Sequence, residues 1–271
     1  MNRLICIAIV WLASPTAMTF GQYIHSKLNE RGAVVFAWYL GDSKWLVDQK
    51  DPKSHLHLLP DLEEIHLQNY RVSRAEMKYV AGLKKLLGLQ LGDGPEGVEC
   101  DQGVMEELAA AKQIEWLWIC KDNLKDADLK WIATMPMVME LSIQERNSGD
   151  PADLGVLVTE EGLSALAAMK NLETLRLWFD VKVSDRVVER FATLPKLTCL
   201  HIHSDQLTDK TVDTIASRMK LEELEIISSR FSPAGIEKLI NVSGLKDLRI
   251  NGKTIRRAPP ELPAAAPTKR E

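Results

Sequence analysis

The sequence has few cysteines and no surplus of basic residues. Four cysteines in 271 residues are too few for a disulfide scaffold. Lysine and arginine total 34 against 38 aspartates and glutamates, a net charge of −4, so we expect no nucleic-acid partner. The hydrophobic fraction of 45% and the charged fraction of 27% are those of a globular protein, which excludes wholesale disorder and a collagen-like chain.

Familiar catalytic motifs are also missing. The sequence contains no nucleophile elbow, Walker loop or H-E-x-x-H motif, and Ser204, beside His203, has no evident acidic residue to orient a catalytic pair. Residues 92–97 match the G-x-G-x-x-G pattern of a dinucleotide-binding loop. However, Pro95 removes one backbone N–H, and we expect the following helix to begin only near Asp101. We therefore predict a protein that is not an enzyme and has no cofactor.

Residues 1–21 have the composition of a secretory signal peptide. Arg3 precedes ten consecutive apolar residues at 4–13, and a Ser-Pro pair ends the run. Ten apolar residues are fewer than the about 20 that a bilayer-spanning helix needs. We expect cleavage after Gly21, a secreted or periplasmic location and no membrane insertion after cleavage. An uncleaved N-terminal anchor is the alternative.

Residues 62–255 consist of one pattern that occurs eight times. Apolar residues recur as apolar-x-x-apolar-x-apolar, and successive units start 24, 28, 24, 34, 25, 24 and 24 residues apart. All of these template positions are Leu, Ile or Val: Leu62, Ile65, Leu67; Leu86, Leu89, Leu91; Ile114, Leu117, Ile119; Val138, Leu141, Ile143; Leu172, Leu175, Leu177; Leu197, Leu200, Ile202; Leu221, Leu224, Ile226; and Leu245, Leu248, Ile250.

This pattern resembles the leucine-rich-repeat family, whose units have an L-x-x-L-x-L core and a period of about 20–29 residues. The resemblance implies an α/β fold, a right-handed solenoid with a parallel sheet on the concave face and helices on the convex face. Apolar residues at helical spacing follow the strands, for example Leu129, Ile132 and Met135. Candidate helix N-caps precede them: Ser73, Asp126, Thr159, Ser184, Thr208 and Ser232.

One position departs from the family's pattern. The family usually has Asn or Cys two residues before the apolar residue that follows each strand. Here the corresponding residues are Tyr70, Asp122, Asp205, Ser229 and Lys253. We therefore expect a weaker ladder of hydrogen bonds between successive turns.

The segments on either side of the repeats differ from them. Residues 22–61 are predicted to form a capping helix over 22–31 and a first strand at Val35, Trp38 and Leu40. Residues 256–271 contain four prolines and four alanines in sixteen residues and are predicted to be a disordered tail.

The residues between the template positions should face the concave surface, because neighbours along a strand point to opposite faces. Our candidate ligand-binding residues on that surface are Trp116, Trp118, Arg176, Trp178, His201 and His203. Exposed tryptophans in a cluster are typical of a contact site for a protein or a glycan. The alternative is that two long loops, inserted after the second and fourth strands, cover the tryptophans.

Cys199, His201 and His203 bring metal-ligating side chains to one face of a strand, with Glu223 and Glu225 expected on the next strand. The alternative is a set of ordinary polar residues on a solvated sheet.

The sequence as a whole predicts an exported, non-enzymatic leucine-rich-repeat protein that binds a protein or glycan through its concave face. The rivals are a metal site at these three residues and an intracellular adaptor similar to F-box proteins. Residues 22–61 contain no F-box-like segment, which argues against the adaptor.

Overall fold

A computed structural model describes residues 23–29, 32–38, 64–67, 71–92, 99–120, 124–144, 158–178 and 183–255. Its strands are β1 (Tyr23–Asn29), β2 (Gly32–Trp38), β3 (Glu64–Leu67), β4 (Arg71–Val72), β5 (Gly88–Leu91), β6 (Glu99–Cys100), β7 (Trp116–Cys120), β8 (Glu140–Gln144), β9 (Thr174–Trp178), β10 (Cys199–His203), β11 (Glu223–Ile227), β12 (Asp247–Ile250) and β13 (Lys253–Ile255). Its helices are α1 (Arg74–Ala81), α2 (Val104–Leu108), α3 (Asp126–Ile132), α4 (Glu160–Ala165) with the 3₁₀ turn η4 (Leu166–Ala168), α5 (Asp185–Phe191), α6 (Asp209–Arg218) and α7 (Pro233–Ile240).

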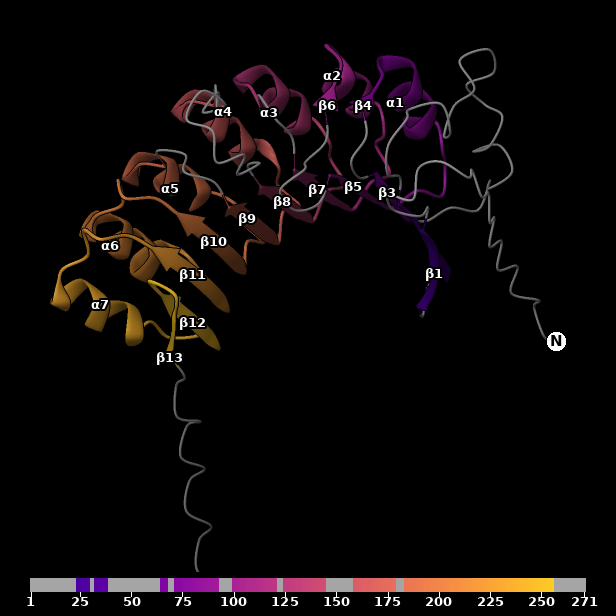
Figure 1. Cartoon of the computed structure of the whole chain (residues 1–271). Helices are drawn as coiled ribbons and strands as arrows, with labels where there is room; N and C mark the ends of the chain where they lie inside the picture. Colours follow the sequence, from indigo (N-terminus) through magenta and orange to yellow (C-terminus); the bar gives the residue numbers. More distant parts are fainter. Residues whose placement is uncertain are drawn as a thin grey trace, which may run out of the picture.

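Within the described ranges, one strand from each repeat joins a parallel sheet in the order β3-β5-β7-β8-β9-β10-β11-β12. Each strand pairs in register with its counterpart one repeat later, so Cys199 lies beside Glu223 and Glu223 beside Asp247. The strands line the inner side of an arc and helices α1–α7 its outer side (Figure 1). This architecture confirms the predicted leucine-rich-repeat fold, while its right-handed winding stays a prediction.

The template residues form the core between sheet and helices. Every template side chain that the structure describes is buried, from Ile65 to Ile250. Leu129, Ile132 and Met135, predicted from their helical spacing, are buried against the same core. Burying a Leu or Ile side chain is worth about 1.5–3 kcal/mol relative to exposure. Because a single unit has no partner for its apolar stripe, this stabilisation arises only when units stack.

The predicted capping helix over residues 22–31 is wrong. β1 lies there instead and pairs antiparallel with β2. β2 contains consecutive β-branched and aromatic residues at 34–36, which favour an extended chain, and β1 pairs with it along its whole length. β2 contains Val35 and Trp38 of the predicted first strand but pairs with β1, and Leu40 lies outside the described residues. The predicted signal peptide at 1–21 and tail at 256–271 lie outside the described residues.

A hairpin that the sequence analysis did not predict closes the last repeat. β13 turns back and pairs antiparallel with β12, with Ile250 opposite Lys253. The two residues between them, Asn251 and Gly252, both have positive φ, 51° and 74°. Asn-Gly is the preferred dipeptide for a two-residue hairpin with this backbone geometry. The hairpin therefore covers the edge that β12 would otherwise leave unpaired.

Hydrogen bonds between helix N-termini join neighbouring repeats. An aspartate in the first turn of one helix accepts bonds from the backbone N–H and the hydroxyl of the next helix's N-cap residue. The pairs are Asp126 with Thr159, Asp185 with Thr208 and Asp209 with Ser232. Thr159, Thr208 and Ser232 also cap their own helices, as predicted. Each cap hydroxyl therefore serves two repeats at once.

Serine and aspartate also connect the turns that follow the strands. The Ser228 hydroxyl donates to the carbonyl of Leu207 at 2.7 Å, and the Ser204 hydroxyl donates to the carbonyl of Val183 at 2.9 Å. Asp205 accepts bonds from the backbone N–H and hydroxyl of Ser229. The C-terminal turns are thus joined by the hydroxyls of Ser204 and Ser228 and by Asp205, which stands where the family usually has Asn or Cys.

We predict that Gly235→Ala destabilises the protein although it lies in a helix. Alanine in place of glycine normally stabilises a helix by up to about 1 kcal/mol. Here a Cβ on Gly235 would collide with the Asp209 carboxylate, so we expect the free energy of unfolding in urea to fall by about 1–3 kcal/mol. In an Asp209→Ala background the collision is gone, and Gly235→Ala should not lower the free energy of unfolding. A single Gly235→Ala variant more stable than wild type would contradict the packing.

We predict that Asp185→Asn removes part of the protein's acid sensitivity. Burial opposes ionisation of Asp185, but bonds from Thr211 and Thr208 outweigh it and hold the pKa below its ordinary value. A lowered folded-state pKa gives stability that is present above the unfolded pKa of about 3.9 and lost as the pH falls through the folded value. Urea titrations at several pH values should show that Asp185→Asn has a lower free energy of unfolding than the wild type. The difference should be at most about 2 kcal/mol at pH 7 and should disappear in acid. A deficit independent of pH would refute this.

Candidate functional site

Two tryptophans meet on the inner face of the sheet. Trp118 on β7 and Trp178 on β9 have ring centroids 5.7 Å apart at an interplanar angle of 59°. The small side chain of Ser142 on the intervening strand lies beside Trp118 in the register, which leaves room for the rings to approach. Both tryptophans are partly exposed. Within the described part of the chain, the Trp118 Nε1–H is buried without a hydrogen-bond acceptor.

Trp116 lies on the same face but packs on the sheet itself. Its indole covers Gly88 on the adjacent strand β5, where any Cβ would collide with the ring. Glycine at 88 is therefore required by the ring. This contact gives Trp116 a structural role that the Trp118–Trp178 pair does not share.

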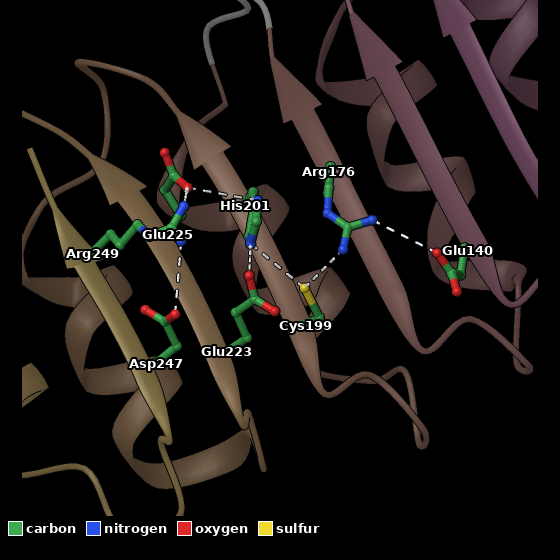
Figure 2. A network of polar contacts seen from close by, with 8 residues as sticks. All are labelled: Glu140, Arg176, Cys199, His201, Glu223, Glu225, Asp247 and Arg249. Atoms are coloured by element: carbon green, nitrogen blue, oxygen red, sulfur yellow. Dashed lines mark hydrogen bonds and ion pairs between the residues drawn. The ribbon is translucent and has the colours of Figure 1, made fainter. Parts of the chain in front are cut away.

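His201 lies at the centre of a polar network (Figure 2). Its side chain is only 7% exposed, with Nε2 2.8 Å from Glu223 Oε1 and Nδ1 3.8 Å from Glu225 Oε2. The ring centroid of Trp178 is 6.2 Å away. The sequence predicts that His201 presents its ring at the surface, but flanking carboxylates bury it. His203, the next outward residue of β10, is exposed.

Arg176 links this network to the N-terminal part of the sheet. One guanidinium nitrogen lies 3.8 Å from Cys199 Sγ and the other 3.7 Å from a Glu140 carboxylate oxygen (Figure 2). Cys199 carries a free thiol whose Sγ is 3.6 Å from His201 Nε2. Burial, reinforced by Glu223 and opposed by Arg176, raises the pKa of this thiol to about 11. The thiol is therefore protonated at neutral pH.

The C-terminal side of the network is held by Arg249. Its guanidinium lies 3.2 Å from Glu225 and 3.7 Å from Asp247. Burial opposes ionisation of Glu223, but its hydrogen bonds to His201 and Cys199 and the nearby positive charge of Arg176 lower its pKa below the ordinary value. Ion pairs therefore lie at both ends of the network, Arg176 with Glu140 and Arg249 with Glu225 and Asp247.

Three different ligand atoms converge in this network. Cys199 Sγ, His201 Nε2 and a Glu223 oxygen all lie within 4.8 Å of one another. The predicted metal trio was Cys199, His201 and His203, and the structure brings the first two together but has Glu223 in place of His203. The signal for Glu223 is the 24-residue period, which sets it beside Cys199 on the next strand.

The sequence also predicts two inserted loops near this face. The inserted segments at 93–98 and 145–157 lie outside the described residues, so their covering of the tryptophans stays a hypothesis.

In the part of the chain that the structure describes, no helix combines the length and apolarity that a membrane span requires.

Comparison with solved structures finds neighbours of low sequence identity. An internalin from Listeria monocytogenes is 22% identical with a TM-score of 0.48, covering 74% of this chain and 57% of that one. A protein from Bacteroides fragilis is 16% identical with a TM-score of 0.46, covering 79% and 73%. A leucine-rich-repeat protein from Leptospira interrogans is 15% identical with a TM-score of 0.33, covering 72% and 56%. The chain thus spans less than two thirds of the length of the internalin. No protein-family model and no curated protein matches.

Proposed function

We propose that this leucine-rich-repeat solenoid is an exported, non-enzymatic scaffold that binds a protein ligand on the inner face of its sheet. The observation that carries the proposal is the Trp118–Trp178 pair, two large aromatic rings in contact, both partly open to solvent. Tryptophan is enriched among the residues that dominate binding energy at protein interfaces. The apolar run at residues 4–13 supports the export part of the proposal.

The surroundings of the pair suit a binding surface. Trp118 and Trp178 each leave part of the side chain open to solvent, so a ligand can contact the rings directly. His203 and Gln144 lie at the same end of their strands as Trp178 and supply a polar rim. Because Arg176, Glu140 and their neighbours are already paired within the sheet, the aromatic pair offers most of the contact energy still available. A glycan would stack on the same rings, so it is the second ligand class to test.

We predict that Trp118→Ala/Trp178→Ala abolishes ligand capture. The mature protein would be used to capture partners from the native extracytoplasmic fraction, and the affinity of the recovered partner measured by calorimetry. Loss of a tryptophan hot spot costs about 2 kcal/mol or more, so we expect affinity to fall at least about 30-fold. Protease treatment of the fraction should abolish capture of the ligand. If glycosidase treatment alone abolishes capture, the ligand is a glycan.

The matched control is Trp131→Ala. Trp131 is a 42% exposed tryptophan on α3, on the outer side of the arc. Its removal changes the same chemical group on the opposite face and should leave capture intact. Folding of all variants is checked by circular dichroism. If the double variant captures the same partner with unchanged affinity, the ligand does not bind at this pair.

We predict that the exported protein begins at Gln22. N-terminal sequencing of the protein from the native extracytoplasmic fraction should show this residue first. Ile9→Arg, which interrupts the apolar run, should block export and leave the unprocessed chain inside the cell. An extracytoplasmic protein that retains residues 1–21 would identify the uncleaved anchor. A wild-type protein found only inside the cell would favour the intracellular adaptor.

A further inference from the structure

We propose that Cys199, His201 and Glu223 bind one Zn²⁺ ion on the inner face of the sheet, beside the Trp118–Trp178 pair. The site needs only side chains of β10 and β11 and does not depend on the identity of any protein ligand. Sulfur, imidazole nitrogen and carboxylate oxygen are the three donor types that zinc takes from proteins. All three converge at one point of the network in Figure 2.

The distances between the donor atoms suit a tetrahedral ion. Zinc with Zn–S of about 2.3 Å and Zn–N of about 2.0 Å holds its sulfur and nitrogen ligands about 3.5 Å apart. Cys199 Sγ and His201 Nε2 are 3.6 Å apart. Glu223 Oε1 is 2.8 Å from Nε2 and must withdraw by about half an ångström. The Glu223 side chain is 39% exposed and has room for this shift.

The second nitrogen of His201 provides independent support. The side chain is 7% exposed, and Nδ1 is buried without a hydrogen-bond partner among the described residues. Its nearest carboxylate oxygen belongs to Glu225, 3.8 Å away, and Arg249 holds that carboxylate from the far side. A metal-bound histidine usually donates its other N–H to a carboxylate. When Nε2 binds zinc, any proton it carries leaves to solvent. The neutral ring then has its one proton on Nδ1 and donates a hydrogen bond towards Glu225.

The charges around the site balance when the ion is bound. The S–Zn bond forms as the Cys199 thiol proton leaves to solvent, with no change of oxidation state. The Cys199 thiolate and the Glu223 carboxylate then neutralise the ion. Arg176 donates to the sulfur from outside, and its own charge is paired with Glu140. The partly exposed side of Glu223 gives the ion a path from solvent and leaves the fourth position to water.

The test is a metal titration of the folded mature protein. After treatment with a chelator, the protein is titrated with Zn²⁺ in competition with a chromophoric chelator. We expect one equivalent to bind with a Kd of about 1 μM or lower. Co²⁺ in place of Zn²⁺ should give a thiolate-to-cobalt charge-transfer band. Absence of that band from the cobalt-loaded protein, or zinc binding weaker than about 100 μM, would overturn the proposal.

Variants separate this site from surface binding of metal. Cys199→Ala should abolish the charge-transfer band and saturable zinc binding. Glu223→Gln keeps the size of the side chain at a partly exposed position and tests the site again if the cysteine variant does not fold. Glu225→Gln should weaken affinity about 10–100-fold and keep the band, because it removes only the outer hydrogen bond. His203→Ala is the matched control for metal binding and should leave the zinc affinity and the cobalt band unchanged. Binding lost in His203→Ala, or retained in Glu223→Gln at full affinity, refutes the assignment.

Discussion

The structure depends on the register in which each strand pairs with its counterpart one repeat later. Because the register follows the repeat, Leu200 lies beside Leu224 and Leu224 beside Leu248, and the core is a stack of equivalent apolar residues. The same register stacks the outward positions, so His201 lies beside Glu225 on the opposite face. A shift of one residue would exchange the two faces and expose the core. The core and the polar network are therefore set by one constraint.

The hydrogen bonds between helix N-termini maintain this register on the outer side of the arc. The bond between Asp126 and Thr159 joins residues 33 positions apart, across the longest repeat. On the inner side, β8 and β9 still pair in register, with Leu141 beside Leu175. The additional residues of that repeat are therefore accommodated between the strand and the next helix, without displacing either layer. This explains how the solenoid tolerates units of different length.

The sequence predicts those features that depend on one repeat and misses those that depend on several. The burial of Leu129 and the cap at Thr208 follow from local spacing and residue type, and both are confirmed. The burial of His201 does not follow from its outward position on a strand, because it is caused by Glu223 and Glu225 of the next repeat. The hairpin at the end of the sheet had a local signal, Asn-Gly, but the repeat pattern assigned its residues to another role.

The distribution of charge on the inner face divides it into two parts with different capacities for binding. In the C-terminal part, Arg249 and Glu225 satisfy one another, so an incoming charged ligand would have to break an existing pair to gain a new one. In the N-terminal part, the Trp118–Trp178 pair has aromatic surface that is partly open to solvent. A ligand of the proposed kind would therefore gain contact energy mainly from the aromatic part. His201 lies between the two parts, with its ring centroid 6.2 Å from that of Trp178. A change in the partners of His201 that moves its ring would therefore alter the surroundings of Trp178.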